Sequence, residues 1–243
     1  MKERFPHALP LILTGLLVGG AMVAIGLGID WLPIQASRQA GRTDDLLWFV
    51  FWASAAVFTI VVTFLLYSVI RFRARPDDDS DGPPIHGNTF LEVIWTAIPA
   101  ALLVVLSVYS YFVLSDNEAL AKDRMTIDVT AEQFAWSFTY PDLKVETGDL
   151  RVPVGRQVYL RLHSKDVIHD FWVNDTRLKA DVVPGITNHL IIDSNRVGTY
   201  QIVCAELCGV GHNVMRSRMI VMPQAAYAAW ARKAAAVGAK ASS

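Results

Sequence analysis

The sequence is poor in charged residues and nearly without cysteine. Charged side chains make up 19% of its 243 residues and hydrophobic ones 53%, whereas soluble globular domains carry about a quarter charged residues. The formal net charge of −1 excludes the basic surface by which proteins bind nucleic acids. Its two cysteines, Cys204 and Cys208, are too few for a disulfide framework. The shortage of charge therefore indicates length that is embedded in a membrane.

Long hydrophobic runs account for that shortage. Ala8–Ile29, Leu46–Ile70 and Val93–Ser115 contain no charged residue, and each is about as long as the roughly 20 residues that cross a bilayer as a helix. Arginines at 71, 73 and 75 follow the second run directly, which predicts that the loop after it is cytoplasmic. Everything after about residue 116 then lies outside the membrane.

The first run allows two interpretations. Behind the basic residues Lys2 and Arg4, Ala8–Ile29 is either a third membrane helix or the apolar stretch of a signal peptide that is removed on export. It is longer than the roughly 7–15 apolar residues of such a peptide, and the small residues suited to cleavage, Ala36–Ser37 and Ala40, come late. These features favour the membrane helix.

The second half of the chain has a different pattern. Short alternating segments separated by turn residues predict the strands of a β-sandwich or barrel. These segments are Met125–Thr130, Phe134–Tyr140, Gln157–Leu162, His189–Asp193, Thr199–Cys204 and Arg218–Met222. Two further segments lie outside this region: the acidic, turn-rich stretch 75–84, which predicts a solvated connector, and the Ala-rich tail Gln224–Lys240, which predicts a short surface helix.

The most informative segment reads Cys204-Ala-Glu-Leu-Cys-Gly-Val-Gly-His-Asn-Val-Met215. It places two thiols, one imidazole and one thioether between two predicted strands, and His169 supplies a second imidazole upstream. Soft sulfur ligands with imidazole suit copper, and a mononuclear electron-transfer site uses a single cysteine. Two thiolates can instead bridge two copper ions. The set fits a binuclear site in which Cys204 and Cys208 bridge, His169 and His212 bind one copper each, and Met215 and a backbone carbonyl complete it.

Two other uses of these side chains stay open. Structural zinc also binds cysteine and histidine, but it normally uses paired C-x2-4-C and H-x3-5-H spacings and seldom methionine. A disulfide between Cys204 and Cys208 is compatible with an exported domain, but it leaves His212 and Met215 without a role. The ligand chemistry favours copper.

The motif from Cys204 to Met215 resembles the CuA motif of cytochrome c oxidase subunit II. His169 and the stretch Lys179–Gly185 are placed as in that family, and the resemblance runs from about residue 45 to 222. It implies a membrane-anchored all-β protein: a cupredoxin-like Greek-key β-sandwich that follows a transmembrane helical hairpin, with an extra N-terminal apolar helix. The expected domains are an N-terminal segment (1–45), the hairpin (46–116), an extracytoplasmic copper domain (117–222) and an Ala-rich tail (223–243).

The resemblance also assigns roles to single residues. It makes copper ligands of the side chains of His169, Cys204, Cys208, His212 and Met215, and of the backbone carbonyl of Glu206. The Glu206 carboxylate would face a magnesium or manganese ion shared with the catalytic subunit, with Asp181 at the same interface. Glu92, at the cytoplasmic start of the third run, is either the entrance of a proton path into the catalytic subunit or an ordinary interfacial residue.

One position departs from the family pattern. The family commonly has Gln-Trp-x-Trp, whose first tryptophan receives the electron from cytochrome c, and this sequence reads Gln133-Phe-Ala-Trp136. Electron entry then falls to Phe134 or Trp136, unless these rings only pack in the sandwich. Acidic and basic residues are nearly equal in number between 125 and 222, which leaves the identity of the donor open.

The function implied by the resemblance is that of the electron-entry subunit of an aerobic respiratory terminal oxidase, cytochrome c oxidase, in the plasma membrane of a bacterium. Its copper would accept electrons from cytochrome c or a related carrier and pass them to a haem of catalytic subunit I, where oxygen reduction drives proton translocation. Subunit III is a further expected partner, and no catalytic residue is expected in this chain.

Three other kinds of protein share some of these features. A quinol oxidase subunit II shares the fold without the copper ligands. A nitrous oxide reductase-type carrier shares the copper site without the membrane hairpin. A copper-delivery protein would exchange its metal readily, whereas this set of ligands can enclose two ions completely.

Overall fold

The computed structural model describes residues 8–73, 82 and 84–241. The chain forms two compact units, one from residues 1–31 and 45–112 and the other from residues 32–44 and 113–243. Lys2, Arg4, Arg75 and most of the acidic connector, on which part of the predicted topology depends, lie outside the described residues.

The first unit consists of long apolar helices. They are α1 (Ala8–Gly28), α2 (Arg38–Arg71) and α3 (Thr89–Asn117), of which α2 and α3 extend into the second unit. Each is long and apolar enough to cross a membrane, and most of their large hydrophobic side chains are exposed, as expected of surfaces covered by lipid. Pro99 lies inside α3, where membrane helices tolerate proline.

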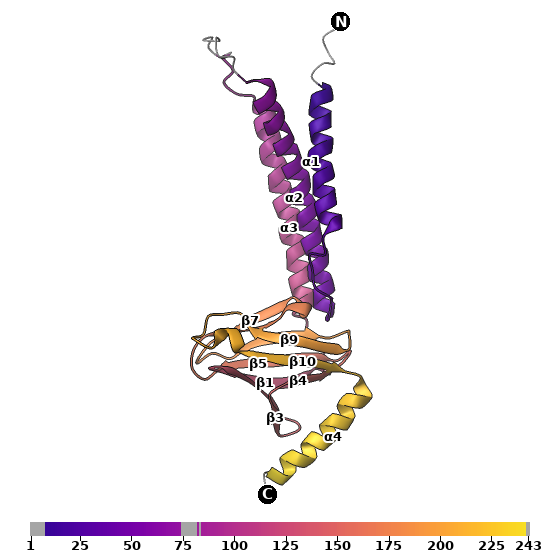
Figure 1. Ribbon diagram of the computed structural model, residues 1–243, viewed down its shortest axis with the longest axis vertical. Helices are drawn as coiled ribbons and strands as arrows, with labels where there is room; N and C mark the ends of the chain where they lie inside the picture. The colour runs from indigo at the N-terminus through magenta and orange to yellow at the C-terminus, as the bar shows by residue number, and fades with distance from the viewer. Residues whose placement is uncertain (1–7, 74–81, 83, 242–243) are drawn as a thin grey trace. The chain divides into compact units, whose positions relative to one another are not determined.

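The second unit is a sandwich of two five-stranded sheets (Figure 1). One sheet has the order β3-β2-β1-β5-β8 and the other β4-β10-β9-β6-β7. The strands of the first are β3 (Val145–Thr147), β2 (Ala135–Tyr140), β1 (Met125–Glu132), β5 (Gln157–Ser164) and β8 (Asn188–Asp193). Those of the second are β4 (Leu150–Pro153), β10 (Arg216–Met222), β9 (Gly198–Cys204), β6 (His169–Val173) and β7 (Leu178–Val182).

The core lies between the sheets and follows the alternation of the strands. Along β1 every second residue is buried, and fully buried side chains such as Phe138, Leu160 and Ile202 meet there. The predicted β-sandwich that follows apolar helices of membrane-spanning length is confirmed. Strands β3, β4, β6 and β7 were not predicted, because two are very short and the other two carry polar residues that mask the alternation.

Residues 32–44, here called the strap, include the first turns of α2 but belong to the β unit. The Ser37 hydroxyl donates to the Thr176 carbonyl (3.1 Å), and both residues are fully buried. Asp44 accepts two hydrogen bonds from the Arg177 guanidinium (2.7 and 2.9 Å), and both side chains are less than a tenth exposed. The sequence alone assigns these residues to a loop, so the strap is an element that only the structure reveals.

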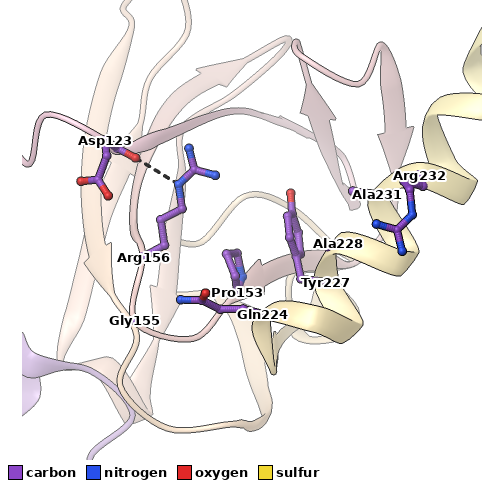
Figure 2. A pocket seen from close by; sticks show the side chains of 9 residues that line it. All are labelled: Asp123, Pro153, Gly155, Arg156, Gln224, Tyr227, Ala228, Ala231 and Arg232. Carbon is purple, nitrogen blue, oxygen red and sulfur yellow. Dashed lines mark hydrogen bonds between the residues drawn. The ribbon is translucent and has the colours of Figure 1, made fainter.

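The C-terminal helix α4 (Gln224–Ala241) packs on the β unit through aromatic side chains. The ring centroid of Trp230 lies 5.1 Å from that of Tyr140. Beside Tyr227 lies a cavity of about 540 Å³ (Figure 2). In its wall, the Arg156 guanidinium donates to the Asp123 carbonyl (3.0 Å). The chain therefore continues beyond the sandwich as helix α4, and a cavity lies beside the first turns of this helix.

Candidate metal centre

The sulfur and imidazole side chains meet at one end of the second sheet. His169 is the first residue of β6 and Cys204 the last of β9, and these two strands are hydrogen-bonded neighbours. Cys208, His212 and Met215 follow on the connection from β9 to β10, in and around the short 3-10 helix η2 (His212–Val214). A long-range strand pairing thus brings His169 to residues that are already close in sequence.

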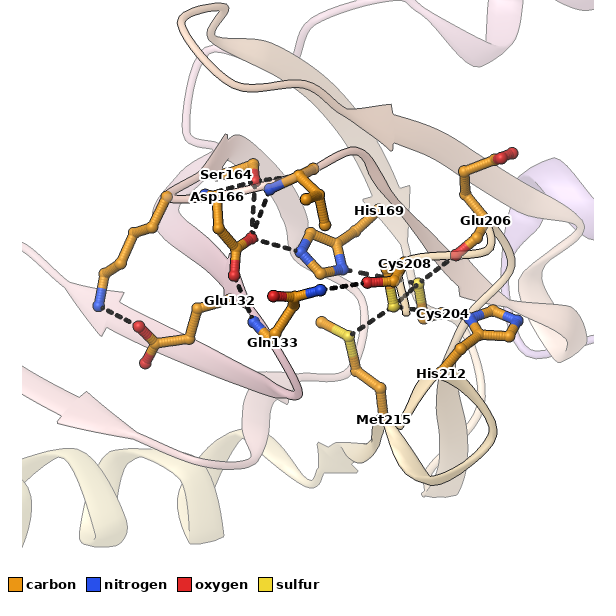
Figure 3. Close-up of polar contacts among 12 residues, drawn as sticks. Glu132, Gln133, Ser164, Asp166, His169, Cys204, Glu206, Cys208, His212 and Met215 are labelled. Carbon is orange, nitrogen blue, oxygen red and sulfur yellow. Dashed lines mark hydrogen bonds and ion pairs between the residues drawn. The ribbon is translucent and has the colours of Figure 1, made fainter. Parts of the chain in front are cut away.

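The five side chains form a compact set (Figure 3). The sulfurs of Cys204 and Cys208 lie 3.8 Å apart, and both cysteines are free and buried. Each thiol lies near one imidazole: Cys204 Sγ is 3.8 Å from Nδ1 of His169, and Cys208 Sγ is 3.7 Å from Nδ1 of His212. The thioether sulfur of Met215 is 3.8 Å from Cys208 Sγ. Two thiols, two imidazole nitrogens and a thioether therefore converge without a disulfide.

Glu206 presents its backbone and its side chain in different directions. Its carbonyl oxygen lies 3.2 Å from Cys204 Sγ, whereas its exposed carboxylate points away from the sulfurs (Figure 3). The residue can therefore contribute a carbonyl to the sulfur side and a carboxylate to a different ligand or partner.

Backbone hydrogen bonds hold the connection that carries these residues. The N–H of Cys204 donates to the Met215 carbonyl (3.2 Å), and that of His212 donates to the Gly209 carbonyl (3.1 Å). Gly209 has a φ of +131°, and a Cβ there would lie 2.7 Å from the side-chain nitrogen of Gln133. Only glycine suits this position, because L-residues rarely adopt such a φ.

Asp166 orients the His169 ring. Its Oδ1 lies 2.9 Å from His169 Nε2, and its carboxylate also accepts the backbone N–H groups of Gln133 and Val167 (both 2.7 Å). Burial raises the pKa of Asp166, but these hydrogen bonds outweigh it and lower the pKa to about 2. The ionised carboxylate can only accept, so Nε2 carries the proton and Nδ1 is left free on the sulfur side.

The ionisation of Asp166 has a consequence for stability. Its pKa is about 2 in the folded chain against 3.8 for the free side chain. Its stabilising contribution is therefore complete above about pH 4 and is lost as the pH falls toward 2.

The Cys208 thiol is protonated at neutral pH when no metal is bound. Burial, with a further effect from the Cys204 thiol beside it, raises the pKa of Cys208 to about 11. A metal cation that binds Cys208 must therefore displace its proton.

The two aromatic side chains predicted for electron entry lie in different surroundings. Trp136 is buried and meets the rings of His169 and Phe171 edge-on, at centroid distances of 6.1 and 5.3 Å. Phe134 is half-buried, and its ring fills the space that a Cβ at Gly209 or Gly211 would need. Phe134 therefore packs against the cysteine-containing connection and stays partly exposed, whereas Trp136 is buried against His169.

Acidic residues surround the Glu206 side of the site. Asp170 and Asp181 are direct partners in the β6–β7 ladder, and Asp170 is buried. Oδ2 of Asp170 lies 3.3 Å from the Lys179 ammonium, while its Oδ1 has no hydrogen-bond partner among the described residues. Burial raises the pKa of Asp170, although Lys179 opposes the shift.

Glu92 lies apart from all of these residues, in the first unit. It is exposed in the first turn of α3, and its carboxylate accepts the backbone N–H of Asn88 (3.3 Å). This contact caps the helix and leaves both predicted roles of Glu92 open.

The comparisons with known proteins agree with this architecture. The family profile described as cytochrome c oxidase subunit II, transmembrane domain, matches residues 24–113, and the profile described as the periplasmic domain of the same subunit matches residues 143–222. The chain belongs to the cytochrome c oxidase subunit II family. In this family the periplasmic domain is the electron-entry domain of a haem-copper oxidase.

Relatives include proteins with two kinds of electron donor in their names. Cytochrome c oxidase subunit 2 of Thermostichus vulcanus is 32% identical over 289 residues, covering 97% of this chain and 88% of the relative. Quinol oxidase subunit 2 of Bacillus spizizenii is 32% identical over 155 residues, covering 60% and 48%. The periplasmic domain of cytochrome oxidase subunit II from Bradyrhizobium japonicum matches with 27% identity and a TM-score of 0.45, covering 48% of this chain and 96% of that one. Family membership alone therefore leaves the donor open.

The donor set itself fits copper. His169, Cys204 and Cys208 offer ligand atoms that all lie within 4.8 Å of one another, and soft thiolate with imidazole suits copper. The residues that sequence reasoning missed are Asp166 and the side chain of Gln133, which donates to the Cys208 carbonyl (2.5 Å). An acid three residues before a predicted histidine ligand was the available signal, since metal-binding histidines commonly donate their second N–H to a carboxylate.

Proposed function

We propose that this chain is the electron-entry subunit of a terminal oxidase in a bacterial plasma membrane. Its β unit would hold two copper ions outside the membrane and receive electrons from cytochrome c or a related carrier. The observation that carries the proposal is the meeting of two free, buried thiols with two imidazole nitrogens and a thioether, each within 3.8 Å of a thiol sulfur.

The arrangement supports a binuclear site better than the alternatives. Each thiol has its own imidazole neighbour, so two bridging thiolates could serve two ions with one histidine each. Met215 lies on the Cys208 side and the Glu206 carbonyl on the Cys204 side. A disulfide would leave both histidines unused, and structural zinc seldom takes methionine.

The copper pair, when bound, would supply one-electron chemistry with little change in geometry. The residues of this chain fix the conditions for it. Met215 is fully buried and both cysteines nearly so, which keeps water from the sulfurs. Asp166 holds the proton on Nε2 of His169, so Nδ1 stays available as a ligand.

Phe134 is the proposed side chain at the point of electron entry. It is partly exposed and touches the two glycines that flank Val210, whose side chain is 99% exposed. Trp136 is buried behind His169, a position that favours packing and orientation of the ring over contact with a donor.

The opposite side of the site is the proposed contact with the catalytic subunit. The Glu206 carboxylate is free to bind a magnesium or manganese ion there, because hard cations prefer carboxylate oxygens. A donor group from that subunit, or bound water, would satisfy the open oxygen of buried Asp170. Glu92, in the first turn of α3, is kept as a candidate for the entrance of a proton path, with an ordinary interfacial residue as the alternative.

The complete donor set argues against a quinol oxidase subunit, which shares the fold without the copper ligands. Oxygen uptake by the assembled oxidase that contains this chain tests the proposal. Reduced cytochrome c should support oxygen uptake, and replacement of Cys204 by serine should abolish it. Uptake that is driven by a quinol alone and is unaffected by Cys204→Ser would contradict the proposal.

A further inference from the structure

One face of α1, here called the glycine face, carries Gly15, Gly19 and Gly26 and lies against α2. Gly15, Gly19 and Gly26 fall within about 40° of one another around a helix of 3.6 residues per turn. A Cβ at Gly15 would lie 3.5 Å from Thr63, and one at Gly19 would lie 3.4 Å from Thr59. Both are van der Waals contacts between the two helices, so α2 approaches α1 closely along this face.

At Gly26 the approach is closer still. A Cβ there would lie 2.6 Å from the Phe51 ring and 2.7 Å from the Trp52 ring, distances that no side chain tolerates unless the rings move. Gly26 is the buried residue of α1. The two aromatic rings therefore lie directly on its backbone.

The contacts share one register over the length of the helix. As the residue number rises along α1 from Gly15 to Gly26, the partner on α2 falls from Thr63 to Phe51 and Trp52. This is the pattern of two antiparallel helices packed side by side (Figure 1). Small residues spaced four apart are the usual means by which membrane helices associate closely.

The glycines on the other faces of α1 show that the arrangement is selective. Gly20 and Gly28 have no atom within 4 Å of the position of a Cβ. Glycine lowers helix stability relative to alanine. On the contact face, the close packing that glycine allows offsets this cost.

The strap bears on whether α1 is removed as part of a signal peptide. Ala36, Ser37 and Ala40, the small residues suited to removal of a signal peptide, are fully buried in the β unit. The N–H of Ala36 donates to the Asp175 carbonyl (2.9 Å), and Ser37 accepts the N–H of Ala40 (3.0 Å). Cleavage here would cut a segment that is buried in the β unit and hydrogen-bonded to it.

We propose that α1 is a permanent third membrane helix of the mature subunit, held on α2 by its glycine face, and that the strap is not a processing site. The matched transmembrane profile begins only at residue 24, so most of α1 lies outside the family's shared region. The proposal is independent of copper binding, because none of its residues belongs to the metal centre.

The mass of the subunit purified from membranes within the assembled oxidase tests retention directly. We expect a chain whose measured mass and peptides still include α1, Ala8–Gly28. A mature chain that begins within or shortly before the strap would overturn the proposal.

Matched leucine substitutions in the full-length chain test the glycine face. Gly19→Leu and Gly26→Leu should lower the thermal midpoint of the helical signal in detergent by more than about 4 °C, because leucine forces the helices apart. Gly20→Leu and Gly28→Leu are the controls and should leave the midpoint unchanged. Equal midpoints for face and control variants would show that α1 is not packed in this way.

Discussion

The two ends of strand β10 differ in what they offer to a ligand. At its start, around Met215, five sulfur and imidazole side chains are gathered with little empty space between them. At its other end, beyond Met222, α4 leaves a cavity of about 540 Å³ whose wall carries arginine, tyrosine and glutamine but no cysteine or histidine (Figure 2). The α4 cavity thus lacks cysteine and histidine ligands, whereas the end of β10 near Met215 has them.

Under the proposed function, donor chemistry locates the functional site and empty volume does not, because soft sulfur and imidazole ligands are what copper selects. The α4 cavity arises because a helix rests on a sandwich through two aromatic rings, Tyr227 and Trp230. The predictions below separate the two ends experimentally.

Loss of one of the two thiols proposed to bridge copper should have the largest effect. Cys208→Ser removes a soft ligand from the position between His212, Met215 and Cys204, so we expect the full-length chain to lose binuclear copper completely. Copper analysis and absorption spectroscopy would measure this, with Ser217→Ala as the control. Retention of two coppers by Cys208→Ser would mean that the thiol is not a ligand.

Copper loading should depend steeply on pH. The pKa of Cys208 is raised to about 11, so its thiol is protonated at neutral pH and must release that proton to the solvent on binding. Apparent affinity should rise about tenfold per pH unit for each proton released. Competition with a chelator at several pH values would measure the slope, and a flat profile would contradict thiolate ligation.

Removal of the charge on Asp166 should weaken the site without destroying it. Asp166→Asn keeps the size of the side chain but no longer requires Nε2 of His169 to carry the proton, so copper affinity should fall by about 10–100-fold. Asp142→Asn, on the exposed surface beside the α4 end, should have no effect. Equal copper affinities for the two variants would show that Asp166 does not orient His169 for copper binding.

A change at Phe134 should affect electron entry and leave copper in place. Phe134→Ala should slow reduction of the loaded site by its donor several-fold, whereas Phe134→Trp should preserve or increase the rate. Stopped-flow mixing with reduced cytochrome c would compare the two variants. If Trp136→Phe slows reduction of the copper site and Phe134→Ala does not, electron entry would be assigned to Trp136.

The smallest effect is expected at the α4 end. Arg232→Ala changes the lining of the cavity but touches none of the sulfur ligands, so copper content and electron-transfer rate should both remain unchanged. Measurements of both on the full chain would check this, and a loss of copper would show that the two ends are coupled.

The sequence predicts much of this molecule because some signals are local. The apolar runs define the helices, since a bilayer demands about 20 apolar residues in a row. The spacing from Cys204 to Met215 identifies a sulfur-rich loop without reference to any other part of the chain. By contrast, the burial of Trp136 and the partial exposure of Phe134 depend on where β2 begins, and the alternation alone does not fix that boundary.

The strap shows where prediction from sequence ends. Its contacts join residues more than a hundred positions apart, such as Asp44 with Arg177, and nothing in the local pattern of residues 32–44 announces them. Asp166 is intermediate: its distance from His169 in sequence is short, but its orientation depends on the Gln133 backbone on another strand connection.

The copper content and electron paramagnetic resonance spectrum of the full-length chain would measure whether Cys204 and Cys208 hold two copper ions together. We expect two coppers per chain with one unpaired electron spread over both. A single localised copper, zinc, or a Cys204–Cys208 disulfide that still excludes copper after reduction would contradict it.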